Sequence, residues 1–139
     1  MPCSRFFVLS SAIYPAMLLT KFFTIEDYSE HDKSGVVSVK INPEHEVFAG
    51  HFPGKPVVPG VFTLQMIKEC LEVILSRKFR YSELLNCKFT DVILPEKTAL
   101  LRVEYDVKET EEAVCLDAGV KSDDRTCLIL KAVLTDVTG

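Results

Sequence analysis

One short region of the chain combines residue types that can move a proton with a backbone that can hold an anion. The segment from Gly50 to Gly60 is Gly-His-Phe-Pro-Gly-Lys-Pro-Val-Val-Pro-Gly, and Gln65 and Glu69 follow it. An imidazole such as that of His51 takes up a proton near neutral pH. A carboxylic acid can donate one, whereas an amide cannot. Backbone N–H groups at the start of a helix stabilise negative charge on an oxygen.

The residues after Gly60 have a helical period and predict the element that positions this region. Gln65 and Glu69 lie one turn apart on the same face of the predicted helix. Pro59 suits the entry to a helix, and the cations in Ser76-Arg77-Lys78 favour a C-terminus there. A helix that is apolar nearly all round is a buried helix. The apolar residues are Val61, Phe62, Leu64, Met66, Ile67, Cys70, Leu71, Val73, Ile74 and Leu75.

The rest of the chain is mostly strand. Residues 36–41 alternate as Val-Val-Ser-Val-Lys-Ile, which indicates a strand with one solvent-facing side. Residues 17–27 predict a strand or a short helix. Closely spaced strands pair antiparallel, so the pattern predicts an α+β fold in which an antiparallel sheet wraps around a long central helix. Further strands are predicted at residues 84–94, 98–108, 113–122 and 126–137.

Composition indicates a single globular domain over residues 1–139. Hydrophobic residues make up 47% of the chain and charged residues 26%, which excludes a disordered protein. The net charge is -4 and no basic tract is present, which disfavours nucleic acid as a partner. The five cysteines are odd in number and form no Cys-x-x-Cys pair. We therefore expect a reducing compartment, the cytoplasm.

Residues 1–16 leave two interpretations open. They form an ordered N-terminal extension, or they precede a later true start at Met17. Pro15 interrupts the apolar run and no clear cleavage site follows it, which disfavours a signal peptide. The run is also too short to span a bilayer, which takes about 20 apolar residues. We therefore expect no contact with a membrane.

The run from Phe48 to Val61, Phe-Ala-Gly-His-Phe-Pro-Gly-Lys-Pro-Val-Val-Pro-Gly-Val, resembles the signature loop of the 3-hydroxyacyl-[acyl-carrier-protein] dehydratases of fatty-acid synthesis. Lys88-Phe89 and residues 92–95 resemble the family's next strand and turn, whereas residues before about Val36 match little. The resemblance implies a hot-dog fold that pairs into a dimer, with its sites at the dimer interface. It also implies an acyl carrier protein or acyl-CoA thioester as the partner, without a cofactor.

The resemblance assigns roles to residues of the loop and of the helix start. His51 corresponds to the base that takes the α-proton of a 3-hydroxyacyl thioester. The backbone at Gly60, with Val61, corresponds to the donor that holds the thioester carbonyl, and Pro59 and Phe52 are the adjoining candidates for substrate binding. Phe52, together with Phe62 and Phe89, either lines an acyl tunnel or fills the core.

The sequence departs from the family at the acid. That position falls on Gln65, which can orient a hydroxyl or a water but cannot donate the proton that the leaving hydroxyl needs. The family often has Glu-Ala-Met-Ala-Gln here, whereas this chain has Gln65-Met-Ile-Lys-Glu69, so the two polar groups are exchanged. We hypothesise that Glu69 recovers part of the acid role. The alternative is a buried carboxylate that is paired for structural reasons.

Three functions follow from this pattern. The first is dehydration of a 3-hydroxyacyl thioester on acyl carrier protein, in fatty-acid or related acyl-chain synthesis. The second is a non-catalytic or half-catalytic hot-dog subunit, in a homodimer or heterodimer, whose acid comes from a partner chain. The third is an acyl thioesterase. His45 and His51 lack a convincing third ligand, so no metal is expected.

Overall fold

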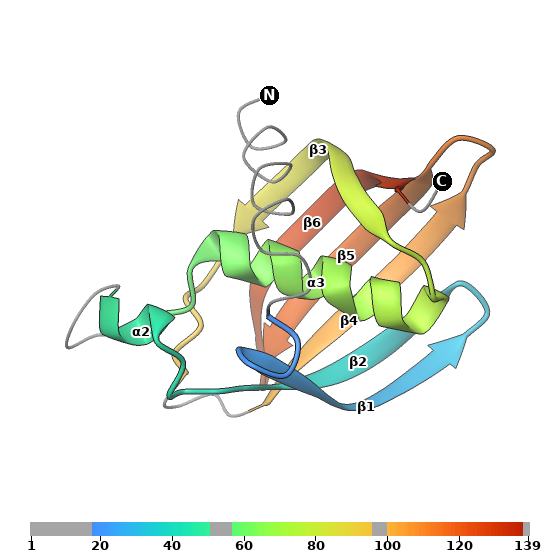
Figure 1. Ribbon diagram of the computed structural model, residues 1–139. Helices are drawn as coiled ribbons and strands as arrows, with labels where there is room; N and C mark the ends of the chain where they lie inside the picture. The colour runs from blue at the N-terminus through green and yellow to red at the C-terminus, as the bar shows by residue number, and fades with distance from the viewer. Residues whose placement is uncertain (1–17, 51–56, 96–99, 138–139) are drawn as a thin grey trace.

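The computed structural model describes residues 18–50, 57–95 and 100–137, with the backbone alone at 49 and 50. Within these residues, six antiparallel strands form one sheet in the order β1-β2-β4-β5-β6-β3. The main helix carries the chain from β2 to β3 at the opposite edge of the sheet (Figure 1). The strands are β1 (Phe23–His31), β2 (Ser34–Ile41), β3 (Phe79–Phe89), β4 (Leu100–Glu109), β5 (Val114–Ser122) and β6 (Arg125–Asp136), and the helices are α2 (Val47–Gly50) and α3 (Gly60–Leu75).

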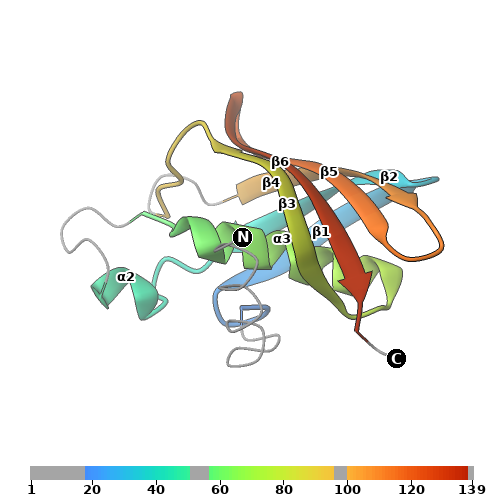
Figure 2. The ribbon, with the colours of Figure 1, turned by 90° about the horizontal axis from the view of Figure 1, so that it is seen from above.

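The sheet curves around α3, which lies against one of its faces, and α2 lies beyond the start of α3 (Figure 2). The antiparallel sheet and the buried helix predicted from the sequence are therefore confirmed. The helix is shorter than predicted, with 16 residues rather than a long span. It ends where expected, because Ser76 adopts the left-handed conformation and its N–H donates to the Glu72 carbonyl.

The core fills the space between α3 and the inner face of the sheet. The strands alternate buried and exposed side chains, which is the pattern of a sheet with one face in the core. From β4 the buried residues include Leu101 and Val103, and from β6 Leu128 and Leu130. The helix contributes Leu64, Met66, Ile67, Cys70 and Leu71 to the same cluster.

The bounds of β3 predicted from the sequence are wrong. The predicted strand at residues 84–94 starts at Phe79 and ends at Phe89. Phe79 and Tyr81 are both buried while Arg80 between them is exposed, so the alternation begins earlier than expected. Irregular pairing with β6 between Tyr81 and Glu83 breaks that alternation. The sequence of the strand therefore lacks the regular period of two that predicts a strand.

Candidate active site at the start of the main helix

The structure describes five of the seven candidate site residues. Pro59, Gly60 and Val61 lie at the entry to α3, Gln65 lies in its first half, and Glu69 lies just past its middle. The other two, His51 and Phe52, lie outside the described residues. The roles that the resemblance gives them therefore stay predictions.

The start of α3 offers backbone donors to a ligand. Pro59 precedes the helix in an extended conformation, and its carbonyl accepts from the N–H groups of Phe62 and Thr63 at 3.0 and 3.2 Å. The Gly60 and Val61 N–H groups come before these and have no acceptor within the helix. They can therefore bind an electron-rich oxygen, helped by the helix dipole.

Gly60 lies close to the ring of Phe89. A Cβ atom added at Gly60 would come within 2.8 Å of the Phe89 ring. The Phe89 ring itself is 53% exposed, so it is not a core residue. The Val58 N–H donates to the Ile93 carbonyl at 2.9 Å, which fastens the chain before the helix to the segment after β3. The described residues just before α3 and the segment after β3 thus lie together.

Gln65 and Glu69 meet, as their spacing predicted. The Gln65 Nε2 donates to Glu69 Oε2 at 2.9 Å, and both side chains are buried, with exposed fractions of 6% and 2% for the two residues. The second carboxylate oxygen, Oε1, accepts from the backbone N–H of Leu19 at 2.9 Å. No sequence pattern predicts the contact of Leu19, because a backbone donor does not depend on the type of side chain.

The environment of Glu69 favours its protonated form. Burial raises the pKa of this carboxyl above its ordinary value. The hydrogen bonds from Gln65 and Leu19 and the positive charge of Lys68 act in the opposite direction and only partly offset the effect of burial. Glu69 is therefore a carboxyl that can hold a proton closer to neutral pH than an exposed glutamate.

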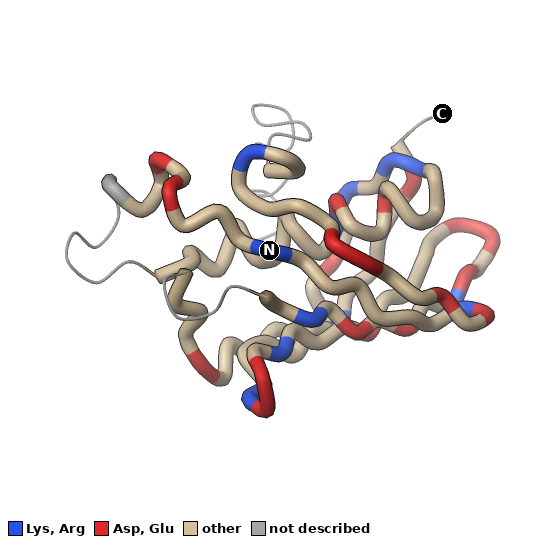
Figure 3. Tube along the Cα trace, turned by 90° about the horizontal axis from the view of Figure 1, so that it is seen from below, with Lys and Arg blue, Asp and Glu red and all other residues tan. Residues whose placement is uncertain are grey.

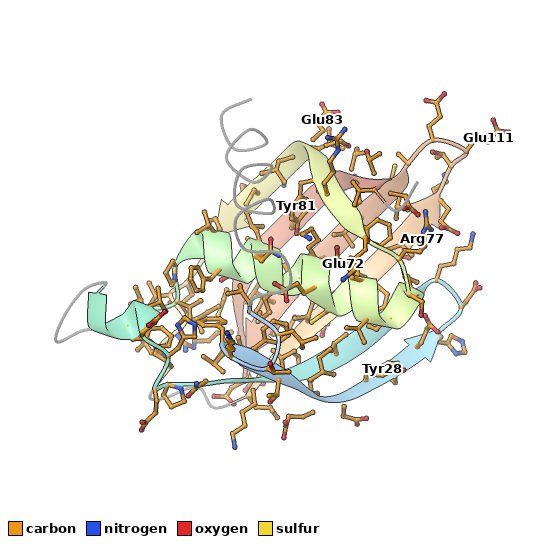
Figure 4. All side chains as sticks on the ribbon, in the orientation of Figure 1. Tyr28, Glu72, Arg77, Tyr81, Glu83 and Glu111 are labelled. Carbon is orange, nitrogen blue, oxygen red and sulfur yellow. The ribbon has the colours of Figure 1, made fainter. Side chains whose placement is uncertain are left out.

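Two further polar contacts fix α3 against β3. The Glu72 carboxylate accepts from Lys68 Nζ at 3.0 Å and from the Phe79 N–H at 2.8 Å. The Tyr81 hydroxyl, which points from β3 toward α3 in Figure 4, donates to the Leu64 carbonyl at 2.7 Å. These contacts hold α3 against β3.

The remaining chemically active side chains have structural roles. His45 accepts from the Val47 N–H at 3.0 Å through Nδ1, and its ring contacts those of Phe22 and Phe62. No group of three potential metal ligands occurs in the described part of the chain. Burial raises the pKa of the Cys70 thiol to about 12, so Cys70 packs in the core as a neutral side chain.

Charge on the described surface is mixed. On the side seen in Figure 3, Lys and Arg are interspersed with Asp and Glu along the strands and turns. This differs from the basic stripe of a nucleic-acid-binding protein. Among the described residues, no helix has the length and apolar character that crossing a membrane requires.

Solved structures share this fold. The chain superimposes on the Dehydratase Heterocomplex ApeI:P from Xenorhabdus doucetiae with a TM-score of 0.64 and 18% identity, over 80% of this chain and 96% of that one. A hypothetical thioesterase from Streptococcus pneumoniae with coenzyme A gives a TM-score of 0.61 at 10% identity, over 85% of this chain and 89% of that one. Together with the strand order and the position of α3, these matches identify a hot-dog fold.

Sequence relatives identify the family of proteins within this fold. The chain is 29% identical to the 3-hydroxyacyl-[acyl-carrier-protein] dehydratase FabZ of Fusobacterium nucleatum over 127 residues, which cover 84% of this chain and 88% of that protein. It is 28% identical to FabZ of Pediococcus pentosaceus, over 85% of this chain and 82% of that protein. The family model described as ApeI dehydratase matches residues 27–126. The chain belongs to the ApeI-like dehydratase family.

Proposed function

We propose that this chain dehydrates a 3-hydroxyacyl thioester on acyl carrier protein to the 2-enoyl thioester. The observation that carries the proposal is the backbone N–H groups at the start of α3, which have no acceptor within the helix, with the buried pair Gln65 and Glu69 on the same helix. Membership of the ApeI-like dehydratase family supports it. So do the FabZ relatives, which are named as 3-hydroxyacyl-[acyl-carrier-protein] dehydratases.

In the proposed reaction His51 removes the α-proton of the substrate. The C–H electron pair forms the new double bond, and the C–O bond to the 3-hydroxyl breaks. Negative charge that builds on the thioester oxygen is stabilised by the N–H groups of Gly60 and Val61. Pro59 sets the entry to these donors, and Phe52 is the proposed neighbour of the acyl chain. The departing hydroxyl takes up one proton and leaves as water.

We propose Glu69 as the source of that proton. Its raised pKa supports this role, and Gln65, which contacts it, has no acidic proton to give. Glu69 lies one helical turn beyond Gln65, so we propose that its proton reaches the departing hydroxyl through an intervening water. Turnover of a 3-hydroxyacyl thioester by Glu69→Gln tests the role, and unchanged turnover would exclude it.

A second hot-dog subunit is the other proposed source of the acid. The heterocomplex from Xenorhabdus doucetiae supports a paired arrangement. In that case the chain binds the thioester and works only with its partner, which is either a second copy or a different hot-dog chain. Light scattering of the purified chain, alone and mixed with a candidate partner, distinguishes these assemblies.

The direct test is loss of water from a 3-hydroxyacyl chain on acyl carrier protein, followed by mass spectrometry of the carrier. We expect formation of the enoyl product by the wild-type chain and its loss in His51→Ala. Product that appears only after a hot-dog partner is added supports the half-catalytic alternative. Release of free carrier thiol without dehydration supports a thioesterase and contradicts the proposal.

A further inference from the structure

A tight turn at the start of the described chain lies against Glu69. Residues 18–22 form this turn, and the Phe22 N–H closes it by donating to the Leu18 carbonyl at 2.7 Å. The Leu19 N–H donates to Glu69 Oε1 at 2.9 Å. In Figures 1 and 2 the turn, in blue, lies beside α3 on the side away from the centre of the sheet. Residues 18–22 are called the strap below.

The strap lies on a face of α3 that is open elsewhere. Val73 follows Glu69 by one helical turn and shares its face. Val73 is 45% exposed, whereas Glu69 is 2% exposed. Among the described residues, the group that reaches Glu69 from outside α3 is the N–H of Leu19 in the strap. Movement of the strap is thus a route by which solvent can reach this carboxyl.

The two halves of the strap are held differently. Phe22 is fully buried, and its carbonyl accepts from the Asn42 N–H at 2.8 Å. The Asn42 side chain donates to the preceding carbonyl at 2.9 Å. The first half is held by the buried side chain of Leu18, and its polar contact with α3 is the hydrogen bond from Leu19 to Glu69. The second half is therefore fixed to the fold, while the first half depends on its contact with α3.

Thr20, between the two halves, has an unfavourable backbone conformation. Its φ is 75°, which β-branched residues rarely adopt because the Cβ atom crowds the backbone. The Thr20 side chain is exposed, so packing does not require a threonine there. Such conformations persist where surrounding contacts hold them. Rotation at Thr20 would release both the strain and the Leu19 N–H.

From these contacts we propose that the strap opens about Thr20 and admits water to the Glu69 carboxyl. Gln65 Oε1 is buried and has no donor among the described residues, so it is an acceptor for a water that enters. The strap is the gate and Thr20 is its hinge. The purpose of the opening rests on the proposed function, in which Glu69 passes its proton through a water.

Alkylation of introduced cysteines measures the opening without turnover. Gln65→Cys places a thiol on the covered part of this helix face, and Val73→Cys places one on its exposed part. N-ethylmaleimide is the probe, and peptide mass spectrometry separates each site from the native cysteines. We expect Gln65→Cys to react measurably but at least about tenfold more slowly than Val73→Cys, because its reaction has to wait for a local opening.

Two variants at Thr20 test the hinge. Thr20→Gly removes the Cβ atom that makes a positive φ costly, so the closed strap is favoured. Alkylation of Gln65→Cys should then slow about five- to thirtyfold, the range of that strain, and turnover of the chain with its native Gln65 should also fall. Thr20→Val keeps the branched side chain and the strain and should change neither rate. Val73→Cys should react at the same rate in every background.

Equal alkylation rates for Gln65→Cys and Val73→Cys would overturn the inference, as would a complete lack of reaction at Gln65→Cys. Equal rates in Thr20→Gly and Thr20→Val would exclude the hinge. If Gln65→Cys does not fold, deuterium exchange of the Leu19 N–H, followed by NMR in the wild-type and Thr20→Gly chains, measures the same opening. The Asn42 N–H, on the fixed half, is the reference and should not change.

Turnover separates this inference from the proposed function. If the wild-type chain dehydrates its substrate and Thr20→Gly slows alkylation but not turnover, the gate is excluded and the proposed function stands. If the wild-type chain shows no dehydration, the proposed function fails, and the alkylation rates still decide whether the strap opens about Thr20.

Discussion

Two polar pairs on α3 have the same spacing and nearly the same burial, yet only one of them is satisfied. Lys68 and Glu72 form an ion pair with side-chain exposures of 6% and 7%, and Glu72 also accepts from the Phe79 N–H. Gln65 and Glu69 are buried as well, but Gln65 Oε1 has no donor among the described residues. Spacing alone does not separate the structural pair from the pair that we propose to be functional; the two differ in the amide oxygen that is left without a donor.

Disrupting the Lys68–Glu72 pair should have the largest effect of all on stability. In Lys68→Met the Glu72 carboxylate keeps its buried position without its cation, which costs about 3–5 kcal/mol of unfolding free energy. Urea denaturation followed by circular dichroism measures this, since the chain has no tryptophan. Gln65→Leu is the matched variant of the other pair and should cost much less. Equal losses in the two variants would contradict the division into structural and functional pairs.

Restoring an acid at position 65 should raise turnover at the pair that we propose to be functional. Gln65→Glu places a second carboxyl beside Glu69, and repulsion between the two raises the pKa of one of them. That carboxyl can then protonate the departing hydroxyl, so we expect turnover to rise about 10²-fold. Lys68→Glu is not a fair control because it breaks the ion pair, so Glu83→Gln on the exposed side of β3 serves instead. No gain in a folded Gln65→Glu protein would point to an acid from a partner subunit.

A substitution at the helix start should affect binding more than stability. The Cβ atom of Gly60→Ala would lie 2.8 Å from the Phe89 ring, but that ring is exposed and can move aside. The better helix propensity of alanine offsets part of the strain, so the unfolding free energy should change by less than about 1 kcal/mol. The displaced ring should raise KM severalfold. Gly60→Ala with Phe89→Leu should recover part of the KM, and a lack of recovery would exclude Phe89 as the cause.

Local patterns explain what could be predicted from the sequence. The helical period located α3 and put Gln65 and Glu69 on one face, because both features depend only on neighbouring residues. The start of β3 at Phe79 was missed, since the burial of Phe79 and Tyr81 depends on α3 packing over them. The hydrogen bond from Leu19 to Glu69 joins distant parts of the sequence through a backbone group, so no pattern of side chains predicts it. The predicted place of His51 opposite an acid stays a prediction.

The pH dependence of stability offers the finest test of how Glu69 differs from an ordinary structural carboxylate. Burial raises the pKa of Glu69 in the folded protein above the ordinary value of 4.5. The folded state therefore keeps this proton at pH values where the unfolded chain has lost it, and Glu69 lowers the unfolding free energy as the pH rises from 4.5 through the folded pKa. Glu69→Gln has no such proton. The free energy of the wild-type chain minus that of Glu69→Gln should fall across this window and then level off. A difference that instead rises with pH would mean that the hydrogen bonds from Gln65 and Leu19 outweigh burial, and that Glu69 is held ionised as a structural group.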